Sequence, residues 1–123
     1  MNPIREKPHK KLILWKKSIG LVTLLYEITK TLPREEEFGL KSQVRRGAVS
    51  VPSNLAEGLA RKSLKDKLHF LNMAQSSLSE IDAQMEIMWE LKYVQEDQLE
   101  QFNKAITEVE QLLQGLIRSL KIK

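Results

Sequence analysis

Residues 43–58 read QVRRGAVSVPSNLAEG, and their apolar spacing fits one continuous α-helix although a proline stands in its interior. A helix turns by ~100° per residue, so this stretch presents one apolar face, which predicts contact with a helical core. The residues of that face are Leu40, Val44, Gly47, Ala48, Val51, Leu55 and Leu59. Pro52 lacks the N–H that would bond to the carbonyl of Ala48, so we expect the helix to kink there.

A second apolar face adjoins the first on the same helix. Phe38, Val49, Pro52 and Ala56 lie on it, with Arg45 among them. The apolar arc is therefore wider than a helix needs when one side faces water. Because contiguous exposed apolar patches mark interaction sites, the sequence predicts a subunit interface made of these five residues. Arg45 is expected at its rim, paired with a carboxylate from a neighbouring subunit.

Arg46 is rotated by ~100° from Arg45 and should therefore have a different role. It is expected to point away from the core, on the side that carries Ser42, Ser50, Ser53 and Glu57. Two readings of this position are open: contact with a phosphate group, or an ion pair with Glu57.

Three further helices are indicated around this one. Apolar residues recur at steps of three and four between positions 14 and 32, 64 and 88, and 99 and 120. The first stripe consists of Leu14, Trp15, Ile19, Val22, Leu25, Ile28 and Leu32. Glu35, Glu36 and Glu37 after Pro33 predict the start of the second helix, and a Ser63–Asp66 capping box predicts the start of the third, whose stripe begins at Leu64.

These patterns predict an all-α fold, an antiparallel up-down-up-down four-helix bundle. The 123 residues are enough for one domain, with residues 1–11 as a flexible basic N-terminal segment. No apolar stretch approaches the ~20 residues that span a bilayer, and the chain has no cysteine, so we expect a cytoplasmic protein without membrane contact.

The sequence offers little for catalysis. Disulfides, thiolate metal sites and cysteine nucleophiles are excluded because cysteine is absent. Asp66 and His69 are spaced like a metal-ligand pair on a helix, but a di-metal bundle needs two such pairs and two more carboxylates. Neither a glycine-rich phosphate loop nor a nucleophile elbow is present. We therefore expect no enzyme activity, no metal and no cofactor.

Basic residues are concentrated in the first half of the chain. Residues 1–33 hold seven Lys and Arg against two Asp and Glu, and residues 34–62 hold six against four. Clustered cations of this kind can follow a phosphate backbone, so the sequence predicts nucleic-acid contact by part of this set. The candidate residues are Lys10, Lys11, Lys16, Lys17, Lys41, Arg46, Arg61 and Lys62.

Three segments together resemble a known family. LWKKSIGLVTLLYEITKTLP, EEEFGLKSQVRRGAVSVPSNLAEGLARKS and FLNMAQSSLSEID are similar to the four-helix-bundle 23S rRNA intervening-sequence proteins, with FGL, QVRR and SVPSNLAEG as the most specific parts. The resemblance extends from about residue 12 to residue 120. It implies a small antiparallel bundle, without catalytic activity, that assembles into a ring of five subunits.

The same family includes relatives of the accessory variability determinant of diversity-generating retroelements. In those relatives a basic surface binds RNA and a reverse transcriptase, so the resemblance implies these two partners beside further copies of the chain. The present sequence is nearer to the general intervening-sequence pattern than to those accessory proteins. Two functions remain open: an oligomeric RNA-binding accessory protein, and a protein-interaction scaffold that binds no nucleic acid.

Overall fold

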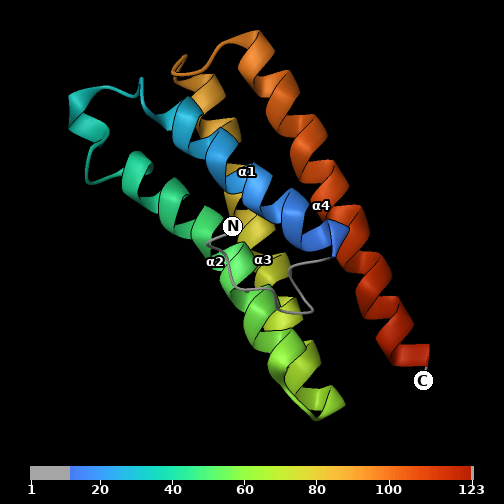
Figure 1. Ribbon diagram of the computed structural model, residues 1–123. Coiled ribbons are helices and arrows are strands. Elements are labelled where there is room, and N and C mark those ends of the chain that lie inside the picture. The colour runs from blue at the N-terminus through green and yellow to red at the C-terminus, as the bar shows by residue number, and fades with distance from the viewer. Residues whose placement is uncertain (1–11, 123) are drawn as a thin grey trace, which may run out of the picture.

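The computed structural model describes residues 12–122, which form four α-helices (Figure 1). They are α1 (Ile13–Thr29), α2 (Leu40–Ala60), α3 (Leu64–Glu90) and α4 (Glu96–Ile122), with a short 3-10 helix, η2 (Arg34–Glu36), between α1 and α2. Consecutive helices run in opposite directions and pack against each other, and α1 also packs against α4. The predicted all-α four-helix bundle is confirmed, and residues 12–122 contain no strand. The N-terminal segment predicted at residues 1–11 lies outside the described residues.

The core is made of apolar side chains from all four helices. The predicted inner face of α2 is confirmed, because Val44, Ala48, Val51 and Leu55 are almost completely buried. The regular stripe of α4 is buried along its middle, at Phe102, Ile106, Val109 and Leu113. Each large apolar side chain that leaves water in this way contributes about 1.5–3 kcal/mol to folding.

The rotation of α1 differs from the prediction. Leu21, which was outside the predicted stripe, is buried in the core, whereas Ile19 keeps 38% of its surface exposed. The helix carries two neighbouring stripes of mainly apolar residues. The stripe that faces the core consists of Leu14, Ser18, Leu21, Leu25 and Ile28. The second stripe lies one residue further around the helix and consists of Trp15, Ile19 and Val22. The predicted stripe mixed residues from both. Ser18 is tolerated inside because its hydroxyl donates to the Trp15 carbonyl at 2.7 Å.

The start of α2 also differs from the prediction. The acidic residues near position 35 form η2, and α2 begins only at Leu40, after Gly39 takes a non-helical conformation. Glu36 nevertheless stabilises this helix start from outside, because its carboxylate accepts the Leu40 N–H at 3.1 Å. The oxygen is so close that a Cβ on Gly39 would lie 2.7 Å from it.

The start of α3 agrees with the predicted cap. Ser63 Oγ accepts the Asp66 N–H at 3.1 Å, which satisfies one of the free amides at the helix start. Leu64, placed at the head of the core stripe by the sequence, is 45% exposed instead. It lies in the first turn of α3, ahead of the buried part of the helix, which begins at Leu71.

Pro52 lies inside α2, which is helical without a break from Leu40 to Ala60. Its ring is largely buried. Small residues surround it along the helix, and a bend of α2 at this position stays a prediction.

α2 and α3 approach each other closely, and glycine makes this possible. A Cβ on Gly58 would lie 3.1 Å from Phe70 Cβ and 3.2 Å from the backbone oxygen of Lys67, and one on Gly47 would lie 3.2 Å from Ile81 Cγ1. Between these two contacts the hydroxyls of Ser50 and Ser77 are 2.6 Å apart, so a hydrogen bond joins the helices. The α2–α3 pair has the most extensive contact in the bundle.

Replacing Gly58 by alanine should therefore lower stability, by about 1–2 kcal/mol after the better helix propensity of alanine is taken into account. Gly20, in the middle of α1, is the matched control because a Cβ there would meet nothing within 4 Å. Gly20→Ala should raise stability by about 0.5–1 kcal/mol. Chemical denaturation of both variants measures the difference, and equal stabilisation by both would contradict the close approach of α2 and α3.

Candidate interaction surfaces

An apolar groove runs along the outside of the bundle between α1 and α2. It has a volume of about 380 Å³, and apart from Ser53 its lining consists of apolar side chains. Three come from the second stripe of α1 and three from the outer face of α2: Trp15, Ile19, Val22, Val49, Pro52 and Ala56. We call this feature the outer groove. It brings together three of the five predicted interface residues, and its α1 wall was not predicted.

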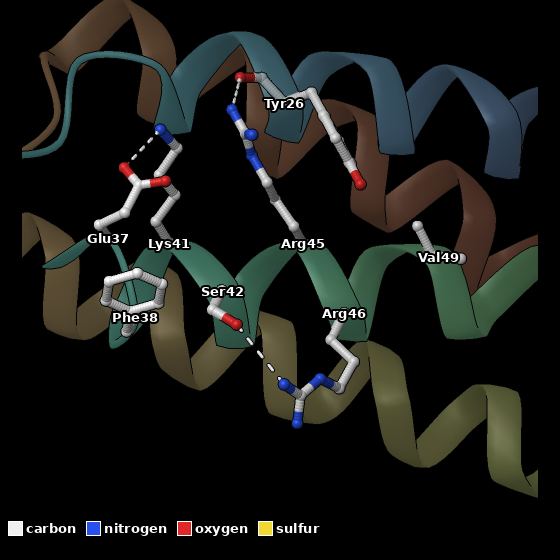
Figure 2. Close-up of a pocket in the computed structure, with 8 residues that line it drawn as sticks. All are labelled: Tyr26, Glu37, Phe38, Lys41, Ser42, Arg45, Arg46 and Val49. Carbon is white, nitrogen blue, oxygen red and sulfur yellow. Dashed lines mark hydrogen bonds and ion pairs between the residues drawn. The ribbon is translucent and has the colours of Figure 1, made fainter.

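Phe38 and Arg45, the other two predicted interface residues, lie outside the outer groove. Both line a shallow depression of about 500 Å³ on α2, together with Tyr26, Lys41 and Arg46 (Figure 2). Phe38 is 94% exposed and stands just before α2 begins. Val49 belongs to both hollows, so they adjoin each other along α2.

Arg45 joins α2 to the last turn of α1. Its Nε donates to Thr29 Oγ1 at 2.9 Å, its Nη2 donates to the Tyr26 carbonyl at 3.1 Å, and its guanidinium lies 4.4 Å from the centre of the Tyr26 ring. Carbonyls in the last turn of a helix lack the usual amide partners, and a cation there also complements the helix dipole. The sequence predicted a neighbour's carboxylate as its partner; within the chain the guanidinium contacts α1.

The side chains of Arg46 and Arg45 leave α2 in different directions (Figure 2). The closest polar partner of Arg46 is the hydroxyl of Ser42 at 3.5 Å, the long limit of a hydrogen bond. Glu57, one of its two predicted partners, pairs instead with Arg61 at 2.8 Å. Arg46 therefore keeps most of its hydrogen-bond donors available to a ligand.

Several of the predicted RNA-binding cations are held in ion pairs. Lys41 contacts Glu37 at 3.0 Å, Lys17 contacts Glu108 of α4 at 2.8 Å, and Arg61 pairs with Glu57 while its guanidinium lies 4.8 Å from the Phe70 ring centre. Within residues 12–122, Lys16, Arg46 and Lys62 have no ion pair. Lys10 and Lys11 lie outside the described residues.

Lys16 and Lys17 line a hollow of about 540 Å³ between α1 and α4, opposite Lys104. Glu108 lies in the same hollow. The hydrogen bond from Lys17 lowers the pKa of Glu108, and the charges of Lys17 and Lys104 act in the same direction. Three cations and one anion give this region a positive balance, and Lys104 was not among the predicted residues.

Charge is unevenly distributed along the bundle axis. At the end formed by the α2–α3 turn and the close of α4, residues 57–67 hold four basic and two acidic residues, and residues 114–122 hold two basic and no acidic ones. At the other end, residues 86–100 hold one basic and five acidic residues, and residues 30–41 hold three of each. We call these the basic end and the acidic end. The α1–α2 and α3–α4 connections both lie at the acidic end (Figure 1). The hydroxyl of Tyr93, in the second connection, donates to the carboxylate of Glu36, in the first, at 3.1 Å.

Residues 12–122 offer neither a helix that could span a bilayer nor a cluster of metal-ligating side chains. None of the helices there is long and apolar enough to cross a bilayer. No group of three His, Asp or Glu side chains in that range comes together in a way that could hold a metal ion.

Comparison with known proteins gives one family. Residues 10–115 match the model of the 23S rRNA-intervening sequence protein family. The fold is similar to the crystal structure of a protein of unknown function from the S23 ribosomal protein family of Bacteroides thetaiotaomicron, with a TM-score of 0.79 and 26% sequence identity. That similarity covers 86% of this chain and 96% of the other. No curated protein matches the chain.

The contacts of the two adjacent arginines predict a large effect on stability for Arg45 and almost none for Arg46. Arg45→Ala removes two hydrogen bonds and the ring contact between α1 and α2, so the free energy of unfolding should fall by about 1–3 kcal/mol. Arg46→Ala is the control, with an expected change within about 0.5 kcal/mol. Denaturant unfolding of both variants tests this; an Arg46→Ala loss as large as that of Arg45→Ala would show that the α1 contacts contribute little.

Proposed function

Because this chain belongs to the 23S rRNA-intervening sequence protein family, we propose that it is a non-enzymatic, oligomeric helix bundle that binds structured RNA through basic side chains. The observation that carries the proposal is the separation of charge between the basic and acidic ends. A polyanion is attracted to one end and repelled by the other, so RNA would approach the α2–α3 turn.

The cations at the basic end suit weak, general contact with phosphates. Lys62 and Lys65 are exposed and have no ion pair among the described residues, and Arg61 can exchange Glu57 for a phosphate group. Exposed ion pairs of this kind are worth no more than about 1 kcal/mol, so such an exchange costs little. The described residues include few exposed aromatic rings on which bases could stack, which favours a mainly electrostatic contact with little sequence preference.

Self-assembly is the second part of the proposal, and the outer groove supports it. An apolar hollow of this kind, open to water along two helices, gains free energy when another protein surface covers it. We propose the ring of five subunits that the family resemblance implies. A ring would repeat each weak cationic site several times and so convert it into useful affinity through avidity.

The partners and setting follow the same proposal. They are further copies of the chain, structured RNA and, as in the retroelement relatives of the family, a reverse transcriptase. We place this activity in the bacterial cytoplasm, where such RNA is found, and assign the chain no cofactor.

One observation favours the scaffold as the second candidate function. Lys17, Lys41 and Arg61 are all engaged in ion pairs, so half of the six predicted cations within the described residues are already neutralised. On this alternative the outer groove binds protein, and the surface charge serves only solubility.

RNA affinity should fall steeply with salt concentration. Lys62→Gln and Lys65→Gln, both at the basic end, should each weaken binding to an RNA hairpin and reduce the slope of log affinity against log salt by up to about one unit. Lys92→Gln removes one cation from the acidic end and should change neither quantity. Filter binding or fluorescence anisotropy at several salt concentrations measures both.

Binding that stays tight and flat between low and physiological salt would contradict the electrostatic proposal. An absence of binding even at low salt would favour the scaffold.

Assembly should depend on the outer groove. Val49→Glu places a carboxylate on an apolar contact surface and should dissociate the oligomer, while the helical circular dichroism stays unchanged because Val49 is 43% exposed. Ile87→Glu on α3, at a similarly exposed position, should leave the mass unchanged. Light scattering at micromolar concentration gives the mass. A monomeric natural protein, or equal loss with both variants, would refute the proposed interface.

A further inference from the structure

Phe38 is the most exposed of the large apolar side chains in residues 12–122, at 94%. It lies in the turn between η2 and α2 and does not belong to the chain's own core. A phenyl ring that stays in water gives up the gain that burial would bring, so a folded chain usually turns such a ring inward. The position of Phe38 therefore needs a structural cause.

The turn that carries Phe38 is held in place by Glu36. One carboxylate oxygen accepts the Leu40 N–H at 3.1 Å, and the other accepts the Tyr93 hydroxyl at 3.1 Å. The pKa of Tyr93 is raised by its partial burial and by this contact with Glu36. Glu36 thus ties the turn both to the start of α2 and to the α3–α4 connection. The ring is presented to solvent by a braced turn, a form suited to insertion into another surface.

The outer groove has the chemistry that such a ring requires. Its lining offers apolar side chains and the single hydroxyl of Ser53, with no charged group. Phosphate groups and charged peptides would lose hydration there without gaining a partner. An aromatic side chain gains from contact with Trp15 and with the aliphatic walls.

A chain cannot insert its own Phe38 into its own outer groove. From Leu40, the first residue of α2, to Pro52 in the groove is about 18 Å at the rise of an α-helix. Phe38 also precedes the first turn of α2 and lies far along the shallow depression from Val49 (Figure 2). The occupant must therefore come from elsewhere, and a second copy offers this ring at a fixed position.

We infer that Phe38 of one copy inserts into the outer groove of the next copy. This inference rests on the self-assembly in the proposed function and specifies which surfaces meet. Each copy inserts its Phe38 side chain into one neighbour and accommodates the Phe38 side chain of another neighbour in its outer groove, so two different places on its surface are used. Such a contact is heterologous, and repeated contacts of this type close into a ring when the rotation between copies divides a full turn.

The experiment uses the full chain with Phe38→Ala, which removes the ring, and with Val49→Glu, which spoils the groove. Phe38→Ala should raise the concentration at which the oligomer is half dissociated by at least about tenfold, with unchanged helical circular dichroism. Leu91→Ala, which trims another exposed apolar residue, is the control and should leave that concentration unchanged. Native mass spectrometry reads the species present.

Mixing the two variants gives the decisive measurement. The Phe38→Ala copy keeps an intact outer groove, and the Val49→Glu copy keeps the phenyl ring of Phe38. One complete contact can therefore form between the two variants. We expect a dimer with one copy of each variant and no larger oligomer. Absence of this mixed dimer, at a concentration that assembles the natural protein, would overturn the inference.

The failure of this inference can be told apart from failure of the proposed assembly. If Phe38→Ala assembles fully while Val49→Glu dissociates, the outer groove is an interface but Phe38 is not its occupant. If both variants assemble fully, or if the natural protein is a monomer, the proposed interface fails as well. Equal weakening by Phe38→Ala and Leu91→Ala would also overturn the specific role of the ring.

Discussion

The close contact of α2 with α3 constrains the rest of the bundle. Gly58 faces the backbone oxygen of Lys67, which cannot move aside as the end of a side chain can, so the distance between the helices is fixed there. The rotation of α2 is then set, with Val51 and Leu55 inside. Val49, Pro52 and Ala56 are consequently left to line the outer groove. The candidate interface thus follows from packing on the opposite side of the same helix.

The sequence predicted the four helices and the inner face of α2, because a buried stripe leaves an apolar repeat of three and four residues. The same repeat could not predict which face of α1 is turned toward the core. Leu21 and Ile19 belong to two neighbouring stripes of equal character, and only contact with the other helices decides that Leu21 is buried. The start of α2 was placed too early because Glu36 acts on the helix from outside it, through a carboxylate that reaches the Leu40 amide.

The candidate sites were less predictable than the fold for a related reason. A pair such as Arg61 and Glu57 can be anticipated from its spacing of four residues on one helix. The contact of Lys17 with Glu108 joins two helices that are distant in sequence, so it depends on the assembled bundle. Arg45 shows the same limit: its place on an outer face was inferred, but its bonds to Thr29 and Tyr26 require the end of α1 beside it. Pairing between helices decides which cations remain for a ligand.

The separation of charge between the two ends of the bundle would affect assembly if the copies meet through a heterologous contact. In a ring whose axis runs along the bundles, every basic end would face one side and every acidic end the other. Neighbouring basic ends would then repel one another, and this repulsion must be outweighed by apolar contacts such as those of the outer groove. RNA bound on the basic side would relieve the repulsion by neutralising the cations. Assembly and RNA binding would therefore favour each other. Bound RNA would reduce the repulsion between basic ends that opposes assembly, and assembly would bring together the cations that bind RNA.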